Sequence, residues 1–365
     1  MKIGLVPPLY ESVPPKMYGG TERVVSHLTE ELVRQKHDVT LFGTGDSVTQ
    51  AKLMSVCDQA TRLNKECVDA TAYHILQMQM VMECAHEFDV LHFHNDYLHF
   101  PFSAMNDYVH LTTLHGRLDI KDLVPIYKKF NTVPLVSISN SQRKPLPYAN
   151  WTGTVYHGLP DNLYTPGTGE GGYLAFLGRI SPEKRPDRAI AIAKRTGIPL
   201  KIAAKVDKAD QAYYEQVIEP LLHHPLIEFI GEIGEDRKSE FLGNAMALLF
   251  PIDWPEPFGM VMIEAMACGT PVIAFDCGSV PEVVDHRETG FIVNTVSEAV
   301  RAVRQLHSFD RVHCRNVFER RFSARRMAQD YVKLYERHIE QRRKMRVITK
   351  HNRQSLGTFR LTAGL

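Results

Sequence analysis

The sequence predicts an α/β protein made of two domains, each built around a parallel β-sheet. Three observations support this fold class. The chain has 365 residues, more than one ordinary hydrophobic core holds, so two domains of about 150 to 200 residues are expected. Short apolar runs alternate with helical segments in both halves, which is typical of a parallel sheet covered on both faces. A glycine-rich stretch at residues 161–172 separates the two halves.

The composition is that of a soluble globular protein, with 44% hydrophobic residues, 23% charged residues and a formal net charge of +1. This neutral balance gives no electrostatic reason to expect nucleic acid as a partner. No apolar run reaches the roughly 18 residues of a spanning helix. The N-terminal apolar run is too short for a signal peptide and is followed by prolines. The six cysteines are scattered without a C-x-x-C pair, so we expect reduced thiols in a cytoplasmic protein.

The first half contains short apolar runs that predict six strands. They lie at residues 2–8, 39–43, 90–94, 111–115, 135–139 and 153–158, and the clearest helix between them is predicted at 70–88. Gly19 and Gly20 follow the first strand and a loop, and they open an amphipathic helix that runs to about Lys36. Paired glycines at such a turn let the backbone approach a phosphate or a sugar closely. An ordinary β–α turn explains the two glycines equally well.

Histidines occur at the ends of two of these strands. His92 and His94 alternate along one strand and so face the same side, as a pair of metal ligands would. No third ligand shows a supporting spacing, and we therefore expect no metal. His115 ends the next strand, where a histidine bonded to a backbone carbonyl is the simpler interpretation.

The second half repeats the alternation, with apolar runs at 173–177, 200–206, 227–230, 245–250, 271–275 and 291–293. After the first of them, Arg179 and Lys184 flank a turn that leads into a helix with Pro186 in its first turn. Two cations over a helix N-terminus can neutralise a diphosphate, although a charged surface turn would look the same. The glycines of the separating stretch satisfy G-x-G-x-x-G, but they precede a strand. We interpret them as a flexible linker and reject a dinucleotide-binding fingerprint.

The stretch from Pro251 to Val272 is the most informative part of the chain. Prolines on either side of Glu256 prevent regular structure there, and from Gly259 onward the apolar residues fall at helical spacing. The predicted helix begins at the carboxyl end of a buried strand, where its free N–H groups suit a phosphate. Glu256 and Glu264 add two carboxylates, which accept hydrogen bonds from the vicinal hydroxyls of ribose or a hexose. Considered singly, each glutamate is an ordinary helix-start acid or solvated helix acid.

The segment Glu256-Pro-Phe-Gly-Met-Val-Met-Ile-Glu264, followed by Ala-Met-Ala-Cys-Gly-Thr-Pro, closely resembles the E-x7-E signature of retaining glycosyltransferases with the GT-B fold, in particular of glycosyltransferase family 4. This resemblance implies two Rossmann-like domains that face each other across a cleft. It places an acceptor domain at residues 1–160, a linker at 161–172 and a nucleotide-sugar domain at 173–322. In the segment 323–365, a helix over residues 324–340 would cross back to the first domain. A basic tail would follow, solvated or in a subunit contact rather than on a membrane.

The resemblance also implies transfer of a hexosyl group from a nucleotide-diphosphate sugar to an acceptor hydroxyl, with retention of configuration. Glu256 would bind the hydroxyls of the donor sugar, Glu264 the ribose, and His115 the outer hydroxyl of the sugar. Arg179 and Lys184 would stabilise the leaving diphosphate. The other implied donor-binding residues are Gly19, Gly20, Ile233, Phe258, Gly259, Met260 and Val261, and the implied acceptor-side residues are Tyr18, Asp96 and Arg143.

Neither a metal nor a cofactor besides the nucleotide sugar is expected, since no Asp-x-Asp occurs in the sequence. UDP is the preferred nucleotide over GDP or ADP, while the acceptor, the hexose and the oligomeric state are left open. The alternative functions are a GT-B sugar-nucleotide epimerase, a phosphorylase-like enzyme with a pyridoxal lysine, and a non-catalytic nucleotide-sugar-binding protein.

Three positions depart from the family pattern. His157 stands where an asparagine is common, and Arg185 replaces the usual glycine of the turn after Lys184. Cys277 replaces the first glycine of the element that ends at Glu282. The role of His157 is therefore open. The extra cation of Arg185 should not harm phosphate binding, and its effect is expected on the turn itself.

Overall fold

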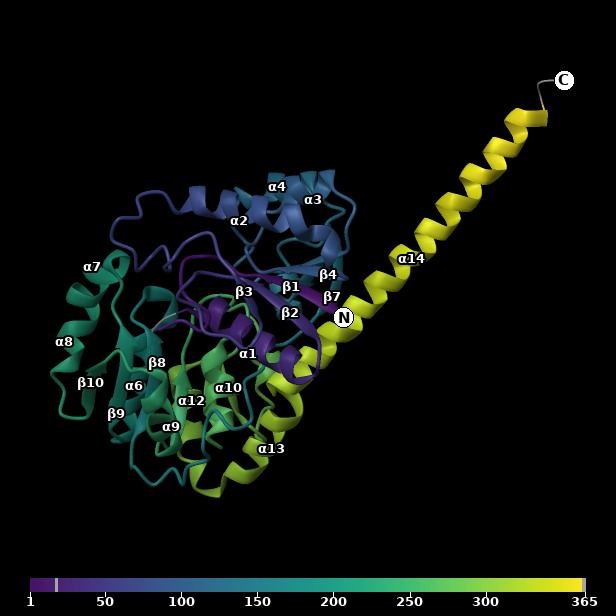
Figure 1. The fold of residues 1–365 in the computed structure, drawn as a ribbon. Coiled ribbons are helices and arrows are strands. Elements are labelled where there is room, and N and C mark those ends of the chain that lie inside the picture. The colour runs from purple at the N-terminus through teal and green to yellow at the C-terminus, as the bar shows by residue number, and fades with distance from the viewer. Residues whose placement is uncertain (17–18, 363–365) are drawn as a thin grey trace.

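The computed structural model describes residues 1–16 and 19–362, which form two α/β domains and a long C-terminal helix (Figure 1). Within the described residues, the first sheet has seven parallel strands in the order β3-β2-β1-β4-β5-β6-β7, and the second has six in the order β10-β9-β8-β11-β12-β13. The predicted fold class is thereby confirmed.

The elements of the first domain cover residues 2 to 154. Its strands are β1 (Lys2–Val6), β2 (Asp38–Phe42), β3 (Lys52–Met54), β4 (Val90–Phe93), β5 (His110–Thr113), β6 (Leu135–Ser137) and β7 (Trp151–Thr154). Its helices are α1 (Gly20–Arg34), α2 (Ala70–Cys84), α3 (Phe100–Met105), α4 (Leu123–Lys129) and α5 (Asn140–Arg143).

The elements of the second domain follow from residue 174. Its strands are β8 (Leu174–Arg179), β9 (Leu200–Lys205), β10 (Ile227–Gly231), β11 (Ala247–Phe250), β12 (Val272–Phe275) and β13 (Gly290–Val293). Its helices are α6 (Pro186–Thr196), α7 (Gln211–Tyr213), α8 (Glu219–Leu222), α9 (Glu235–Gly243), α10 (Met260–Ala267), α11 (Val280–Val283), α12 (Val296–Val303) and α13 (Arg311–Arg321), and α14 (Ala324–Thr362) ends the chain.

The central strands are buried on both faces, which explains their continuous apolar sequences. Ile3, Leu5 and Val6 of β1 are fully buried, as are Ala247 and Leu248 of β11. The chain reverses its direction of travel across the first sheet between β1 and β4, and across the second between β8 and β11. Crevices for ligands open at the carboxyl ends of the strands at such switch points. The topology therefore brings the segments after these four strands to the edges where a ligand would bind.

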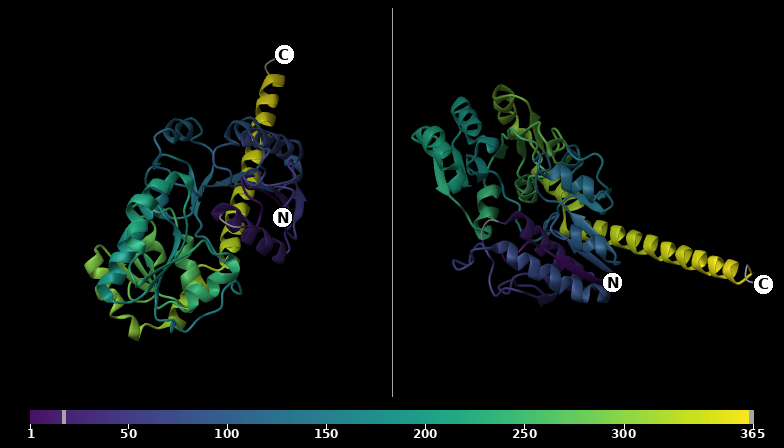
Figure 2. Two further views of the ribbon diagram at one scale, coloured as in Figure 1. Left: turned by 90° about the vertical axis from the view of Figure 1, so that its left-hand side faces the viewer. Right: turned by 90° about the horizontal axis from the view of Figure 1, so that it is seen from above.

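Helix α14 returns from the second domain to the first. Met327, Ala328, Tyr331 and Tyr335 are buried in the core cluster that contains the inward face of α1. Figure 2 shows the two domains as neighbouring bodies, with the yellow α14 running along the first and then projecting from it. None of the helices in the described part of the chain combines the length and apolar character that spanning a membrane requires.

Several predicted boundaries were wrong. β3 was not predicted, the last strand of the first domain is Trp151–Thr154 rather than 153–158, and a short 3₁₀ turn at Ala85–Glu87 ends the helix predicted over 70–88. The helix predicted to stop at residue 340 continues to Thr362. It continues because residues 341 to 356 contain neither proline nor glycine, so nothing in the backbone interrupts it.

The glycine-rich segment between the domains, predicted as a flexible linker, is hydrogen-bonded to the second domain. Backbone N–H groups of Gly167, Gly169 and Gly171 donate hydrogen bonds to carbonyls of the second domain at 2.9 to 3.0 Å. The Arg311 guanidinium donates to the Gly167 carbonyl at 3.0 Å. These glycines lie close to the α9 backbone, so that a Cβ on Gly167 would overlap Gly243. Close packing rather than flexibility explains them.

Candidate active site between the domains

A cavity of about 620 Å³ lies between the two domains, at the carboxyl ends of the strands where each sheet reverses its order. It is lined from both sides, by the segments after β1, β4 and β5 in the first domain and after β8, β10 and β11 in the second. The predicted residues that line it are Gly19, Gly20, Asp96, His115, Arg179, Lys184, Ile233, Glu256, Phe258, Gly259, Met260, Val261 and Glu264.

Besides Asp96, two residues were predicted on the acceptor side, Arg143 and Tyr18. Arg143 is not among the lining residues: its Nε donates to Ser137 Oγ at 2.9 Å and its guanidinium lies over the Trp151 ring. These contacts hold the side chain against β6 and β7, so the structure does not bring Arg143 together with the other predicted site residues. Tyr18 lies outside the described residues.

The N-terminus of α10 reaches the cavity through Gly259, Met260 and Val261. Gly259 precedes the helix with φ of 78°, in the left-handed region that glycine adopts without strain. A Cβ at this position would lie 2.8 Å from Cε of Met262 and 3.0 Å from Cζ of Phe250. The tight turn thus directs the unpaired N–H groups of the helix into the cavity, where they favour an anion.

Glu256 is held at the cavity wall from three sides. Its carboxylate contacts the Lys184 ammonium and accepts a hydrogen bond of 3.1 Å from Nε1 of Trp254. Its backbone carbonyl accepts from Ser279 N at 3.0 Å, and a Cβ on Gly278 would overlap its backbone. The loop before α11 therefore supports this glutamate directly.

Glu264 is 4% exposed and belongs to a chain of ion pairs that crosses between the domains. Lys238 Nζ lies 2.9 Å from Glu264 and 3.4 Å from Glu235. Glu235 also contacts Arg23 of α1 and accepts a hydrogen bond from the Tyr164 hydroxyl. Our sequence analysis did not identify Arg23, Glu235 or Lys238. The available signal was the three-residue spacing of Glu235 and Lys238, which follow shortly after the predicted donor-binding residue Ile233.

Arg179 is surrounded by carboxylates. It contacts Glu183 and lies 3.5 Å from both Asp207 and Asp210. Both predicted phosphate-binding cations, Arg179 and Lys184, are therefore neutralised by acidic side chains in the structure. Their charge is compensated and they are held close to the cavity.

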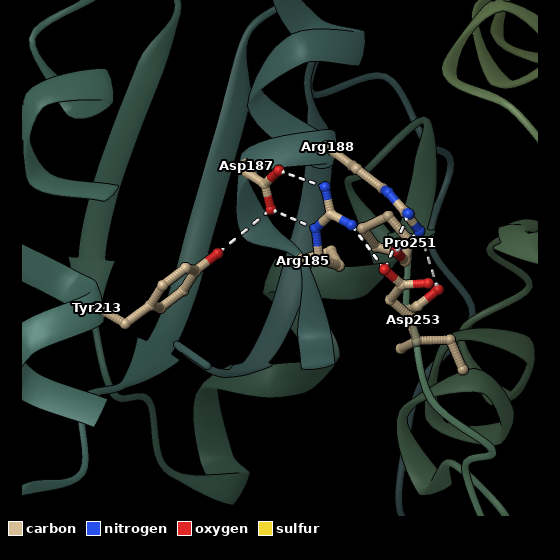
Figure 3. A network of polar contacts seen from close by, with 7 residues as sticks. Arg185, Asp187, Arg188, Tyr213, Pro251 and Asp253 are labelled. Atoms are coloured by element: carbon tan, nitrogen blue, oxygen red, sulfur yellow. Dashed lines mark hydrogen bonds and ion pairs between the residues drawn. The ribbon is translucent and has the colours of Figure 1, made fainter. Parts of the chain in front are cut away.

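Arg185 is not among the residues that line the cavity. Its guanidinium forms a two-point contact with Asp187 at 2.9 Å and reaches Asp253 at 2.7 Å, as Figure 3 shows. The residue has φ of 52°, which explains why a glycine suits this turn. The turn itself is retained, since α6 begins at Pro186 as predicted. The two aspartates hold a residue that is otherwise disfavoured in this conformation.

Four histidines contact one another at the cavity, and three of them, His94, His115 and His157, line it. His94 Nδ1 and His115 Nε2 are 2.8 Å apart, and the His115 ring stacks on His157 with centroids 5.2 Å apart. The His92 ring contacts the His94 ring. Burial lowers the pKa of His115 to about 3 and the pKa values of the other three well below their ordinary range. The rings are therefore neutral and can bind hydroxyl groups by hydrogen bonds.

His157 connects the two sides of the cavity. Besides stacking on His115 of the first domain, its ring meets Phe258 of the second edge-to-face at 4.8 Å.

Asp96, which follows β4, lines the cavity with a left-handed φ of 54°. Glu22 of α1 also lines it, is 5% exposed and was missed in our sequence analysis. Its place three residues after Gly19 was the available signal.

Glu282 joins the domains beside the site. Its carboxylate accepts hydrogen bonds of 2.7 Å from the backbone N–H groups of Asn140 and Ser141, and one of 3.0 Å from the Tyr156 hydroxyl. It therefore caps α5 of the first domain from the second.

Among the described residues, no group of three or more His, Cys, Asp or Glu side chains has an arrangement that could hold a metal ion.

Two family models match this chain, one for each domain. The model described as Glycosyltransferase Family 4 matches residues 18–166, and the model described as Glycosyl transferases group 1 matches residues 168–313. The chain belongs to the family 4 glycosyltransferases. The family resemblance found in the E-x7-E segment is thereby confirmed for both domains of this family member.

Relatives of this family member include D-inositol 3-phosphate glycosyltransferase of Mycolicibacterium smegmatis, which is 25% identical over 206 residues. That match covers 50% of this chain and 46% of the relative, so it spans less than half of the relative's length. Among solved structures, AviGT4, a glycosyltransferase involved in avilamycin A biosynthesis, aligns with a TM-score of 0.72 at 21% identity, covering 93% of this chain and 98% of its own. HepE of Anabaena in complex with UDP aligns with a TM-score of 0.71 at 17% identity, covering 91% of this chain and 99% of its own. These structures share the GT-B fold of this chain.

Proposed function

We propose that this protein is a retaining glycosyltransferase that moves a hexosyl group from a UDP-sugar to an acceptor hydroxyl without a metal ion. The observation that carries the proposal is the convergence of Glu256 and Glu264 of the second domain with His115 and the Gly19–Gly20 turn of the first on one cavity. Carboxylates and neutral imidazoles bind sugar hydroxyls, while a helix N-terminus and two cations bind phosphates.

Glu264 would accept hydrogen bonds from the ribose hydroxyls, because one of its oxygens is bonded to Lys238 and the other is available. The diphosphate would lie at the N-terminus of α10 and exchange the acidic partners of Arg179 and Lys184 for its own oxygens. Glu256 and His115 would bind the hexose hydroxyls. Each part of the donor thus meets a group of matching chemistry.

In the proposed reaction, the bond between the anomeric carbon and the β-phosphate oxygen breaks, and both bonding electrons leave with the diphosphate. The acceptor hydroxyl attacks the same face of the oxocarbenium-like species and forms the new glycosidic bond. Its proton passes to the departing phosphate oxygen, so the products are a glycoside and the nucleoside diphosphate. The cations and the helix terminus stabilise the charge that develops on the leaving group.

Three findings support the finer parts of this proposal. The Anabaena protein HepE has been solved with UDP and with UDP-glucose, which favours a uridine nucleotide. Absence of Asp-x-Asp from the sequence, together with Arg179 and Lys184 at the cavity, favours a cation-assisted reaction without a metal. The six cysteines are free thiols in the described chain, which suits a reducing compartment such as the cytoplasm.

Thermal unfolding with UDP, GDP and ADP, each with and without magnesium, tests donor binding. A ligand at 100 times its dissociation constant adds about 2.7 kcal/mol of stability, and we expect this effect with UDP whether or not magnesium is present. No stabilisation by any of the three nucleotides would contradict the proposal.

Release of UDP from a UDP-sugar in the presence of acceptor hydroxyls tests catalysis. Glu256→Ala should abolish transfer while the protein still unfolds in one cooperative thermal transition, which shows that the fold is intact. Isomerisation of the donor sugar without an acceptor would instead identify a sugar-nucleotide epimerase. Undiminished transfer by Glu256→Ala would remove Glu256 from the mechanism.

A further inference from the structure

A network of buried hydroxyl and imidazole groups connects α14 to strands β4 and β5 of the first domain. Tyr335 Oη lies 2.7 Å from Nδ1 of His92, and the Thr113 Oγ1 lies 2.7 Å from Nε2 of the same ring. The Tyr331 hydroxyl is 3.0 Å from Thr113 Oγ1. All four side chains are fully buried. Both ring nitrogens of His92 are thus bonded, and the orientation of the ring is determined from two sides.

The ring of His94 packs against the ring of His92. The two ring centroids are 3.9 Å apart with an angle of 42° between the planes. His94 makes one hydrogen bond through Nδ1, to Nε2 of His115 at 2.8 Å, and its Nε2 has no partner within the described structure. The orientation of His94 therefore depends on the His92 ring and on His115.

The states of His94 and His115 are coupled. A neutral imidazole carries a single N–H, and the hydrogen bond between the two rings requires one nitrogen to donate and the other to accept. The tautomer of one ring consequently determines that of the other. It also decides whether Nδ1 of His115, which has no partner among the described residues, donates to a sugar hydroxyl or accepts from it.

We propose that Tyr331 and Tyr335 are positioning residues for the transfer reaction, acting through His92 and His94 to hold the ring of His115 in the orientation that meets the donor sugar. The return of α14 to the first domain supplies these two hydroxyls, so the C-terminal helix completes the catalytic site as well as the hydrophobic core. This role rests on the proposed function, in which His115 binds the hexose.

The same domain contains a matched network that does not reach the cavity. His99 is bonded to Ser103 Oγ at 2.6 Å and to Thr112 Oγ1 at 2.7 Å, and the Tyr108 hydroxyl is 2.8 Å from Ser103 Oγ. Thr112 precedes Thr113 on β5, so their side chains point to opposite faces of the sheet. Tyr108 thus provides a control, a partly buried phenol in a similar network that does not reach His115.

The test compares Tyr335→Phe with Tyr108→Phe, since each change removes one hydroxyl and keeps the ring. In Tyr335→Phe we expect kcat to fall about tenfold while the donor KM stays within about twofold, because misplacement of a reacting group reduces the chemical step more than binding. Tyr108→Phe should leave both constants within about twofold of the wild type. Thr113→Val, which removes the hydroxyl shared by His92 and Tyr331, is the second variant and should behave as Tyr335→Phe does.

A spectroscopic measurement distinguishes positioning from a merely structural role. In protein with ¹⁵N-labelled histidine, the ring nitrogen signals of His115, assigned by their loss in His115→Gln, should shift in Tyr335→Phe and not in Tyr108→Phe. Unchanged His115 signals in Tyr335→Phe, or equal losses of kcat in the two tyrosine variants, would overturn the proposal. This measurement needs no turnover. Shifted signals in a protein that transfers no sugar would therefore support the network and refute the proposed function instead.

Discussion

The ammonium group of Lys184 contacts the carboxylate of Glu256, although the two residues follow different strands of the second domain and lie 72 positions apart. Lys184 also lies over the Trp254 ring, 5.1 Å from its centroid, and Trp254 donates to the same carboxylate. Each group compensates the charge of the other at a partly buried wall of the cavity, where an unpaired charge would be destabilising. A donor that binds here meets both groups at once, one suited to phosphate and the other to hydroxyls.

The two glutamates of the E-x7-E segment should have separable effects. In the proposed mechanism Glu264 binds the ribose, so we expect Glu264→Gln to raise the dissociation constant of UDP about tenfold. Glu256→Gln should lower kcat by about a hundredfold or more with little change in UDP affinity, since the proposed partner of Glu256 is the reacting sugar. Calorimetric titration with UDP and steady-state kinetics measure the two effects. Equal losses of UDP affinity in both variants would contradict the division of roles.

Gly278→Ala should damage the site through the backbone of Glu256. Gly278 has φ of 62°, and an added Cβ would overlap the Glu256 backbone, so Glu256 must move. We expect kcat to fall at least about tenfold, as happens when a reacting group shifts by about 1 Å.

Gly197→Ala is the matched control for Gly278→Ala. Gly197 has a similar φ of 71°, but a Cβ there would have no neighbour within 4 Å. It ends α6 away from the cavity, and its substitution should cost about 1 kcal/mol of stability without lowering kcat. Similar kinetic effects of the two substitutions would show that backbone strain, not displacement of Glu256, is responsible.

At Arg185, the glycine variant should be more stable than the alanine variant, which is the reverse of the usual order for these two residues. Arg185→Gly relieves the left-handed conformation while it loses the contacts to Asp187 and Asp253, so we expect the stability to change by less than about 1 kcal/mol. Arg185→Ala loses the same contacts and keeps the strain, and should be about 1 kcal/mol less stable than the glycine variant. Chemical denaturation of both variants checks the order. An alanine variant as stable as the glycine variant would show that the turn carries no strain.

The contact of Arg23 with Glu235 should link nucleotide binding to the arrangement of the domains. Glu235 holds Lys238, which in turn holds Glu264, so loss of Arg23 should loosen the ribose site from the opposite side of the cavity. We expect Arg23→Met and Glu235→Gln each to weaken UDP binding several-fold, with a coupling energy of about 1 kcal/mol in a double-mutant cycle. Arg34→Met, on the same helix but paired with Glu31, is the control. Additive effects of the two variants would exclude the coupling.

Glu22 should make the protein less stable as pH rises. Burial raises the pKa of Glu22 from 4.5 to about 7, so the folded state holds a proton that the unfolded chain releases. This contribution to stability is complete below about pH 4.5 and is lost as pH rises through about 7. Glu22→Gln should therefore gain about 2 kcal/mol over the wild type at pH 8 relative to pH 4.5.

Urea denaturation of both proteins at the two pH values measures the effect of Glu22. Asp38→Asn changes an exposed acid of the same domain and serves as the control. A difference between the wild type and Glu22→Gln that does not vary with pH would mean that Glu22 is not buried as a neutral acid.

Hydrophobic periodicity was sufficient to predict the alternating strands and helices, and it failed where the periodic signal is short or absent. β3 has three residues, with no buried position, and gives no apolar pattern. For the long α14, the predicted end at residue 340 came with the family resemblance, whereas the helix continues to Thr362 through a segment that contains no proline. Arg143 follows a strand end as predicted, but its side chain turns toward Trp151, which a strand position alone cannot reveal.

Local sequence alone specified the two α/β domains, the turn at Gly259 and the spacing of the glutamates, because hydrophobic spacing and turn residues act over a few neighbouring positions. Tertiary structure decided which charges and rings meet. Lys184 and Glu256, Arg23 and Glu235, and His92 and Tyr335 are separated by 72, 212 and 243 positions, respectively. Such contacts depend on how whole domains and the returning α14 pack together. No local pattern in the chain records that packing.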